Sequence, residues 1–335
     1  MRLVFWLLTI PASAMAQVAD GPINSVIKGD ITGIHDPVIA REQGIYYVFS
    51  TNTDEPPATL RIRSSPDLVT WTKRGHVLAR LPDWATALIP GARGAWAPDI
   101  SRVNDRYLLY YSVSTFGSNR SAIGLLSNQT LDPDAPNYSW RDEGVVVEST
   151  RESDFNAIDP NHVVDRDGRH WLSLGSFWSG IKLFELDPRT GKLLKPDARP
   201  HSLARRRAPA NAPAPVEAPF IVTRPDHYYL FVSYDYCCKG VNSTYYVVMG
   251  RSKDITGPYV GKDGSQLLDG EGTVFIREDP GRSRFRGPGH NGWLHDADGK
   301  DYVVYHAYDR ENDGKSVLRI SPVTWRADGW PELAR

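Results

Sequence analysis

Five short motifs recur along the chain at nearly equal intervals, and each one precedes an aromatic run. Every motif holds an acidic residue or a histidine beside proline or glycine. From Asp36 through Asp99, Asp159 and Glu217 to His290, the steps are 63, 60, 58 and 73 residues. Such a period indicates repeated units, because each unit stacks on its neighbours to bury a shared core. The chain is therefore predicted to contain five similar units.

The composition of the repeats indicates strands. The motif segments are Gly33–Pro37, Trp96–Ile100, Ala157–Asn161, Val216–Phe220 and Gly287–Asn291. The runs that follow them are Ile45–Phe49, Arg106–Tyr111, His170–Leu174, His227–Val232 and Asp301–Tyr305. These runs are rich in Val, Ile, Leu, Tyr, Phe and Trp and lack helical spacing. Each interval also has room for a third and a fourth strand. We therefore expect an all-β, five-bladed β-propeller with four-stranded antiparallel blades.

The motifs also predict where an active site would lie. The first strand of a propeller blade lies nearest the axis, so motifs at the starts of five first strands converge at one end of the central channel. Glycosidic bond cleavage needs one carboxyl group that donates a proton and one that activates water. A third carboxylate nearby raises the pKa of the acid by like-charge repulsion. Asp36, Asp159 and Glu217 are thus the candidate catalytic residues.

The two other motif residues carry less information. A single histidine such as His290 is more often a hydrogen-bonded structural residue than a metal ligand. A metal held by one histidine and several waters leaves almost no spacing pattern in a sequence. Asp99 shares the repeat but has no chemical role that its neighbours suggest, so we expect it to be structural.

The N-terminus carries the features of an export signal. Arg2 precedes the apolar run Leu3–Ile10, and small residues stand at Ala14 and Ala16, as signal peptidase requires. We expect a signal peptide over 1–16 and a single catalytic domain over 17–335, in a secreted or periplasmic monomer. The formal net charge of −1 gives no reason to expect a nucleic acid or a membrane surface as partner.

Aromatic residues and cysteines add two open points. Ten Trp and sixteen Tyr suit a sugar-binding cleft, since flat rings cover the C–H faces of sugars, although core packing also explains many of them. The only two cysteines, Cys237 and Cys238, are adjacent. They form either a vicinal disulfide or two buried thiols. The segment Arg205–Pro215 is interpreted as an exposed connection between the third and fourth units.

The motifs in this order resemble glycoside hydrolase family 43, and within it the endo-1,5-α-L-arabinanases. The resemblance covers nearly all of the mature chain. The segments that carry it are Gly33–Pro37, Trp96–Asp99, Ser112–Gly124, Ile158–Pro160, Gly175–Ile181, Glu217–Phe220, Asp235–Val241 and Gly287–Asn291.

The resemblance implies a role for each matching residue. Asp36 would be the general base of an inverting mechanism, Glu217 the general acid, and Asp159 the residue that orients the acid and adjusts its pKa. His290 would contact a hydrated ion in the channel, usually assigned as calcium, and a hard cation suits oxygen ligands and retained water. The rings expected along the cleft are Trp96, Phe116 and Trp178, with ordinary packing as the alternative for each.

Three functions remain possible from the sequence. The leading hypothesis is an exported enzyme that cleaves internal α-1,5-L-arabinofuranosidic bonds of arabinan, a polysaccharide. An exo-acting β-xylosidase or arabinofuranosidase is the alternative if the loops around Thr53–Ala58 or Arg205–Pro215 close one end of the cleft. A non-catalytic polysaccharide-binding propeller is disfavoured, because it would repeat one site in every blade, whereas here the converging residues differ.

Overall fold

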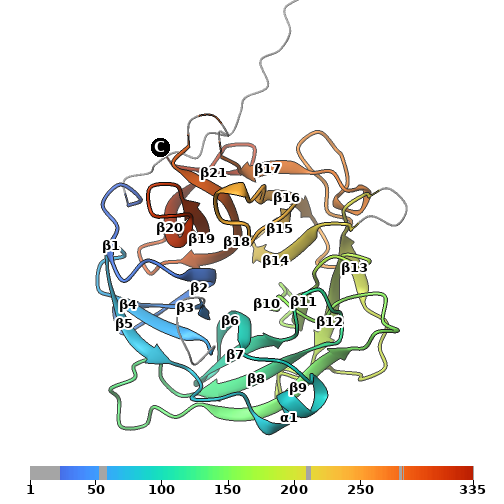
Figure 1. Ribbon diagram of the computed structural model, residues 1–335. Coiled ribbons are helices and arrows are strands. Elements are labelled where there is room, and N and C mark those ends of the chain that lie inside the picture. The colour runs from blue at the N-terminus through green and yellow to red at the C-terminus, as the bar shows by residue number, and fades with distance from the viewer. Residues whose placement is uncertain (1–22, 53–58, 209–212, 279–280, 282, 335) are drawn as a thin grey trace, which may run out of the picture.

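The computed structural model describes residues 23–334, except 53–58, 209–212, 279–280 and 282. The predicted signal peptide, 1–16, lies outside the described residues. Five β-sheets surround a common axis (Figure 1), and in each sheet the four blade strands follow chain order from one edge to the other. All strand pairs within the blades are antiparallel. The predicted all-β, five-bladed propeller is confirmed.

Each blade is built from one continuous stretch of chain. Blade 1 contains β2 (Ile34–Glu42), β3 (Ile45–Asn52), β4 (Arg61–Ser65) and β5 (Thr70–His76). Blade 2 contains β6 (Ala95–Val103), β7 (Arg106–Val113), β8 (Ser121–Asn128) and β9 (Arg141–Ser149). Blade 3 contains β10 (Asn161–Val164), β11 (His170–Leu174), β12 (Ile181–Leu186) and β13 (His201–Ala204). Blade 4 contains β14 (Val216–Thr223), β15 (Tyr228–Tyr234), β16 (Tyr246–Ser252) and β17 (Thr273–Ile276). Blade 5 contains β18 (Phe285–His295), β19 (Asp301–Asp309), β20 (Lys315–Trp325) and β21 (Pro331–Leu333). Outside the blades lie β1 (Lys28–Gly29), α1 (Asp83–Leu88) and the 3₁₀ turns η1 (Gly240–Asn242) and η2 (Leu267–Asp269).

The hydrophobic core is divided into five clusters, one between each pair of neighbouring blades. Strand β7 shows how one strand supplies two of them. Tyr107 and Leu109 pack in the cluster shared with blade 1, whereas Leu108 and Tyr110 pack in the cluster shared with blade 3. Successive side chains of a strand point to opposite faces, so a strand buried on both faces is apolar throughout. This is why the second strand of each repeat is a continuous apolar and aromatic run.

The N-terminal segment closes the ring by joining blade 1 to blade 5. Strand β1 pairs in parallel with β5 of blade 1, and Thr32 forms an isolated bridge with Val317 of β20. The side-chain oxygen of Asn24 accepts the backbone N–H of Ile320 at 2.8 Å. The segment therefore lies between the first and the last blade and hydrogen-bonds to both.

Each motif contains one residue other than glycine with a positive φ angle, and these five residues define the true alignment of the blades. They are Asp36 (φ 52°), Ala97 (φ 44°), Asp159 (φ 59°), Ala218 (φ 56°) and His290 (φ 49°). Four of them precede proline. Such φ values are uncommon for residues other than glycine and mark a local bend. The motif residues that the sequence spacing aligned therefore do not occupy equivalent positions in two of the blades. Asp99 lies two residues after the bend of blade 2, and Glu217 lies one residue before the bend of blade 4.

Candidate active site

The bend residues are fixed by hydrogen bonds that run from blade to blade. The backbone N–H of Ala97 donates to Thr51 Oγ1 at 2.8 Å, that of Asp159 to Ser112 Oγ at 2.9 Å, and that of His290 to Ser233 Oγ at 2.9 Å. In each case the acceptor lies at the end of the second strand of the preceding blade. The N–H of Asp36 follows the same rule, donating to His306 Nδ1 of β19 at 3.2 Å.

Blade 3 departs from this rule because its second strand is followed by Gly175, which has no side chain. A Cβ atom at Gly175 would lie 2.7 Å from the carbonyl oxygen of Gly180, so the position is closed to larger residues. Asp159 supplies the acceptor in place of a second-strand side chain: its Oδ2 accepts a hydrogen bond from the backbone N–H of Ala218 at 3.1 Å. This bond ties one candidate catalytic carboxylate to the residue that follows Glu217.

Asp36 is held ionised by a tight set of donors. Its Oδ2 accepts the hydroxyl of Thr51 at 2.6 Å, and its Oδ1 lies 3.0 Å from Nδ1 of His290. Burial by itself would raise the pKa of Asp36, but the charge and the hydrogen bond of His290 outweigh it and place this pKa well below its usual range. Asp36 therefore carries the negative charge that a general base requires.

His290 and His306 flank Asp36 in different protonation states. Burial would lower the pKa of His290, but Asp36, Asp159 and Glu217 raise it to about 9. Burial lowers the pKa of His306 well below its usual value, so its ring is neutral and its Nδ1 can accept the Asp36 N–H. The positive charge at this end of the axis therefore resides on His290, where it balances the carboxylates.

Asp159 is buried and Glu217 is half-buried, and their carboxyl groups interact electrostatically. Burial raises the pKa of Asp159, and the charges of Glu217 and Asp36 raise it further. Burial also raises the pKa of Glu217, whose Oε2 accepts the hydroxyl of Ser176 at 2.8 Å. Two close carboxyl groups resist losing both protons, so the pair retains a proton where Asp36 has none.

Asp99 lies in the joint between blades 2 and 3. It is 3% exposed, its Oδ2 accepts the backbone N–H of His162 at 2.8 Å, and its Oδ1 accepts the amide of Asn161 at 3.2 Å. Burial raises the pKa of Asp99 to about 7. Asn161 continues the pattern by accepting the N–H of Ile221 from blade 4 at 2.8 Å. The structural role expected for Asp99 is confirmed.

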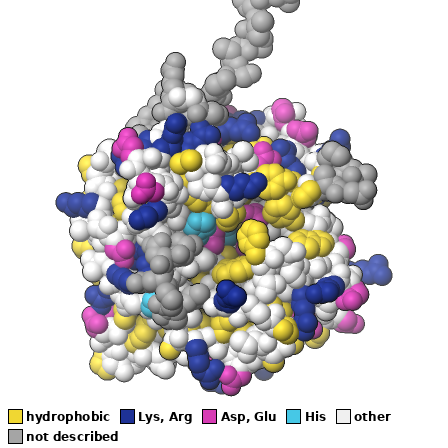
Figure 2. All heavy atoms as spheres, in the orientation of Figure 1, with side chains coloured by type: hydrophobic (Ala, Val, Ile, Leu, Met, Phe, Trp, Pro, Cys, Tyr) yellow, Lys and Arg dark blue, Asp and Glu magenta, His cyan; other side chains and the backbone are white. Residues whose placement is uncertain are grey.

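Three aromatic side chains stand in segments at the end of the propeller where the carboxylates lie. Trp178 is 40% exposed and Phe116 is 87% exposed, which core packing does not explain, and Trp96 is partly buried in β6. Trp178 belongs to a loop joined to the acid, because Ser176 forms a bridge with Glu217 and Phe177 N–H donates to the carbonyl of Val216. Figure 2 shows histidine and acidic side chains at the middle of the face, with hydrophobic side chains beside them.

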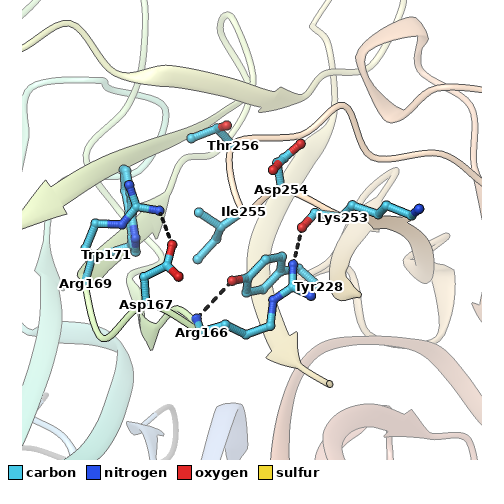
Figure 3. Close-up of a pocket in the computed structure, with 9 residues that line it drawn as sticks. All are labelled: Arg166, Asp167, Arg169, Trp171, Tyr228, Lys253, Asp254, Ile255 and Thr256. Atoms are coloured by element: carbon cyan, nitrogen blue, oxygen red, sulfur yellow. Dashed lines mark hydrogen bonds and ion pairs between the residues drawn. The ribbon is translucent and has the colours of Figure 1, made fainter. Parts of the chain in front are cut away.

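A separate cavity of about 360 Å³ lies at the opposite end of blades 3 and 4 (Figure 3). It is lined by charged residues that already pair with one another. Arg166 stacks on the ring of Tyr228 at 4.5 Å, and Arg169 stacks on Trp171 and donates to Asp167 at 3.2 Å. Asp167, one of the two acidic residues that line this cavity, already pairs with Arg169.

The residues beside His290 fit a hydrated cation. Neither polar atom of the Asn291 amide has a hydrogen-bond partner among the described residues, although the residue is 2% exposed. Buried polar atoms are normally satisfied by protein or by ordered water. Nδ1 of His290 lies 3.0 Å from Asp36 Oδ1, and Nε2 of this ring can coordinate a cation once the ring is neutral. His35, Asp36 and His306 also lie close together, within 4.8 Å, but His306 Nδ1 already accepts the Asp36 N–H.

The sequence predicted the three carboxylates and His290 and missed the residues that hold them. Thr51, Ser112 and Ser233 stand at the same place at the ends of three aromatic strands, and His306 stands there in blade 5. A small polar residue that recurs near the end of three of the five aromatic strands was therefore a visible signal. The predicted alternatives for Cys237 and Cys238 are also resolved, because the two residues form a disulfide.

Comparisons with known proteins give the family. The model of glycosyl hydrolases family 43 matches residues 24–331. An extracellular endo-α-(1→5)-L-arabinanase of Bacillus subtilis (strain 168) is 42% identical over 89% of this chain and 87% of its own length. An extracellular exo-α-(1→5)-L-arabinofuranosidase of Cellvibrio japonicus (strain Ueda107) is 41% identical, over 90% and 86%. The solved structure of a Cellvibrio cellulosa α-L-arabinanase with arabinohexaose is 40% identical, covers 91% of this chain and 96% of that chain, and has a TM-score of 0.84.

Both relatives are extracellular by name, which confirms the expected location outside the cytoplasm. In the part of the chain that the structure describes, no helix has the length and apolar character required to cross a membrane. The matched length, the propeller and the carboxylates near its axis agree on one assignment. The chain belongs to glycosyl hydrolases family 43 and is a glycoside hydrolase.

Proposed function

We propose that this enzyme cleaves internal α-1,5-L-arabinofuranosidic bonds of linear arabinan with inversion at the anomeric carbon. The observation that carries the proposal is the pairing of opposed carboxyl groups, an ionised Asp36 beside His290 and a proton-retaining Asp159–Glu217 pair. The relatives named for arabinan support the choice of substrate, and one structure among them binds arabinohexaose.

In the proposed reaction Asp36 removes a proton from a water molecule, which attacks the anomeric carbon. Glu217 donates its proton to the departing glycosidic oxygen, so the bond breaks without an alkoxide leaving group. Inversion requires the two carboxyl groups to stand far enough apart to admit that water, about 6.5–9.5 Å. Trp178, Phe116 and Trp96 would cover sugar rings along the cleft.

The hydrogen bonds indicate which member of the pair carries the proton. Asp159 accepts the backbone N–H of Ala218, and a hydrogen bond donated to a carboxylate favours its ionised form. Glu217 is half-buried and accepts a hydrogen bond from the hydroxyl of Ser176, which can reorient to suit either protonation state. We therefore assign the proton to Glu217, and the negative Asp159 keeps it there.

A hydrated calcium ion beside His290 is part of the proposal. A bound cation would favour the neutral form of His290, whose Nε2 would then contact the ion or one of its waters, and Asn291 would hydrogen-bond to those waters. When bound, the ion would supply positive charge near the carboxylates. The base and acid steps above are assigned to the protein's own residues.

Exo action remains the second candidate, since one relative is named as an exo-acting enzyme. The loop Thr53–Ala58 and residues 209–212 of the Arg205–Pro215 segment lie outside the described residues. The described part of that segment is fixed to blade 4, where Arg206 donates to Asp235 at 3.1 Å and to the carbonyl of Gly270 at 3.0 Å.

One experiment separates these possibilities. The wild-type enzyme is incubated with debranched linear arabinan and, in parallel, with xylan, and product lengths are followed over time. Endo action gives a broad set of oligosaccharides early, whereas exo action gives a single short product from the start. Proton NMR of the first products should show the inverted anomer. Retention, or release of sugar from xylan alone, would contradict the proposal, and Glu217→Gln serves as the inactive control.

A further inference from the structure

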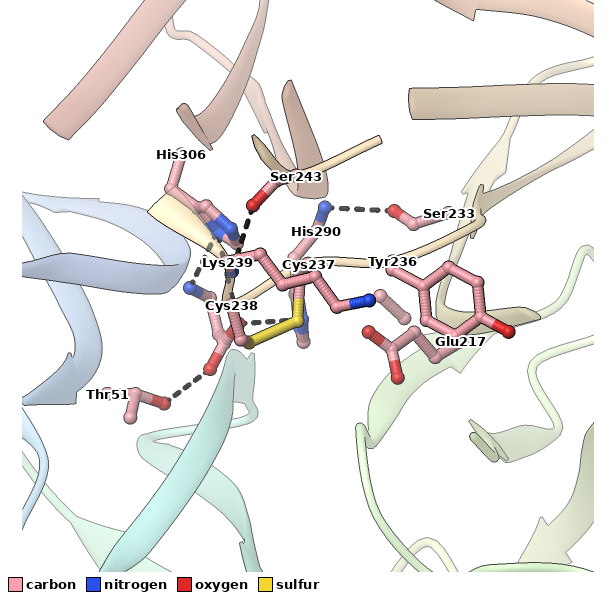
Figure 4. Close-up of a disulfide and its surroundings, with 12 residues drawn as sticks. Thr51, Glu217, Ser233, Tyr236, Cys237, Cys238, Lys239, Ser243, His290 and His306 are labelled. Carbon is pink, nitrogen blue, oxygen red and sulfur yellow. Dashed lines mark hydrogen bonds and ion pairs between the residues drawn. A yellow bond between two sulfur atoms is a disulfide. The ribbon is translucent and has the colours of Figure 1, made fainter. Parts of the chain in front are cut away.

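The β15–β16 connection, residues 235–245, leaves blade 4 at the end of the molecule where the carboxylates lie. This follows from register, because Ser233 near the end of β15 pairs with Glu217. The connection contains the Cys237–Cys238 disulfide. Figure 4 shows Thr51, Glu217, His290 and His306 around this disulfide. Thr51 and His290 both contact the Asp36 carboxylate, so the disulfide lies beside the candidate base as well as the candidate acid.

Hydrogen bonds hold the disulfide in place across the junction of blades 4 and 5. The backbone N–H of Cys238 donates to the hydroxyl of Tyr308 in β19 at 2.8 Å, and that of Lys239 donates to Ser243 Oγ at 3.0 Å. The turn before β20 also approaches closely, since a Cβ atom at Gly314 would lie 3.2 Å from the Val241 nitrogen. The position of the two sulfur atoms is therefore determined by contacts with two blades.

The disulfide presents an apolar surface in polar surroundings. Cys238 is exposed and Cys237 is half-buried. Sulfur is polarisable and makes favourable contacts with flat apolar groups, while a disulfide has no N–H or O–H to donate. Nearby, the ammonium group of Lys239 lies 4.4 Å from the ring centre of Tyr236 and can donate to sugar hydroxyls. A surface that is apolar in one part and hydrogen-bonding at its edge matches a sugar ring.

A purely stabilising role does not explain this bond. The entropy that a disulfide removes from the unfolded chain grows with the number of residues in the loop it closes. A bond between adjacent residues closes the shortest loop available, so it restricts the unfolded chain little. Its exposure beside Glu217 and His290 instead suggests a role in contact with ligand.

We propose that the Cys237–Cys238 disulfide is a substrate-binding platform, on which the C–H face of one arabinofuranosyl residue lies while its hydroxyls contact neighbouring polar groups. This inference rests on the proposed function for the identity of the sugar. It makes the disulfide a positioning element for the substrate, distinct from the residues that transfer protons.

The test removes the sulfur surface and measures binding and turnover separately. Arabinohexaose affinity is measured by calorimetry in a Glu217→Gln background, with and without Cys237→Ala/Cys238→Ala, and kcat and KM are measured in the active enzyme. The double variant should weaken binding and raise KM about five- to tenfold, the loss expected from removing about 40–60 Å² of apolar contact. Its kcat should stay within about twofold and its unfolding temperature within about 2 °C of wild type.

Two further variants separate contact from loop restraint. Cys237→Ala/Cys238→Met restores an apolar sulfur surface without the bridge and should recover part of the lost affinity. Leu194→Ala removes an exposed apolar side chain from the β12–β13 connection at the opposite end of blade 3 and should leave KM unchanged.

The outcomes distinguish this inference from the proposed function. An unchanged affinity in the double alanine variant overturns the platform, as does a joint loss of affinity, kcat and thermal stability that methionine does not rescue, because that pattern belongs to a loop restraint. Failure of the wild-type enzyme to hydrolyse or bind any arabino-oligosaccharide would instead overturn the proposed function.

Discussion

The side-chain oxygen Oδ2 of Asp159 accepts the backbone N–H of Ala218 at 3.1 Å, in the one blade junction where no second-strand side chain fills that role. Elsewhere a threonine, a serine or a histidine of the preceding blade satisfies the equivalent N–H. A candidate catalytic carboxylate has thus replaced a structural acceptor, and its position is fixed by the backbone beside Glu217.

The first prediction concerns this double role. Asp159→Asn keeps an oxygen that can accept the Ala218 N–H but removes the negative charge. Loss of that charge should lower the pKa of Glu217, so the alkaline limb of the kcat/KM profile should move to lower pH and kcat should fall about 10²-fold. The measurement is a pH–rate profile on linear arabinan. Glu148→Gln, which neutralises an exposed carboxylate on β9, is the control, and an unmoved limb would contradict the assigned role.

The second prediction concerns Thr51, whose hydroxyl donates to Asp36 at 2.6 Å and accepts the N–H of Ala97 at 2.8 Å. Thr51→Val removes both bonds with little change in volume. We expect kcat/KM to fall about tenfold, since a hydrogen bond to a charged group contributes roughly 1.5 kcal/mol or more. Asp36 should stay ionised at neutral pH in this variant, because His290 still holds its pKa low. Thr51→Ser should restore kcat/KM, and equal activity of the valine and serine variants would argue against the role.

The third prediction concerns stability at low pH. Burial, with a smaller effect of His170, lowers the pKa of His162 to about 3. Because the folded pKa lies below the unfolded value of about 6.5, only the unfolded chain binds this proton between those values, so stability is present above pH 6.5 and is lost as pH falls towards 3. Between these two pH values, the free energy of unfolding of His162→Gln should therefore fall less steeply than that of the wild type. The two slopes should differ by about 1.4 kcal/mol per pH unit. Denaturant unfolding from pH 6.5 to 4 measures this, with His201→Gln as the exposed control; parallel curves would refute it.

The fourth prediction concerns the ion. Calcium added to chelator-treated enzyme should raise the unfolding temperature, because a ligand that binds only the folded state stabilises it. His290→Gln should abolish calorimetric calcium binding. Asn291→Leu, which replaces the unpaired amide with an apolar group of similar size, should weaken it about tenfold. If calcium leaves the unfolding temperature unchanged and produces no binding heat with wild-type enzyme, the site does not hold this ion.

The architecture could be predicted from the sequence because the repeat period and the apolar strand patterns both result from the packing of blade on blade. The two faces of β7 are buried in two different core clusters, so the strand must be apolar on both faces, and this is visible as the apolar run from Tyr107 to Tyr111. Asp36, Asp159 and His290 were also found at equivalent positions, because each occupies the bend itself.

The spacing of the motifs could not predict which residue of each motif occupies the bend. Ala97 and Ala218 occupy the bends of blades 2 and 4, but alanine carries no chemistry that draws attention, so the acidic neighbours Asp99 and Glu217 were aligned instead. A shift of one or two residues is small against a period of about sixty. It nevertheless decides whether a carboxylate lies at the site, as for Glu217, or in a blade junction, as for Asp99.

The way the ring is closed bears on how the enzyme is made. Asp36 lies in the first blade, whereas His306 and His290 come from the last, so 270 residues separate Asp36 from the imidazole that receives its N–H. Contacts between such distant parts of a chain form late, since a long loop must first be closed. A chain still being synthesised would contain Asp159 and Glu217 before the residues that hold the candidate base were present. The candidate site is therefore complete only when the last blade has joined the first.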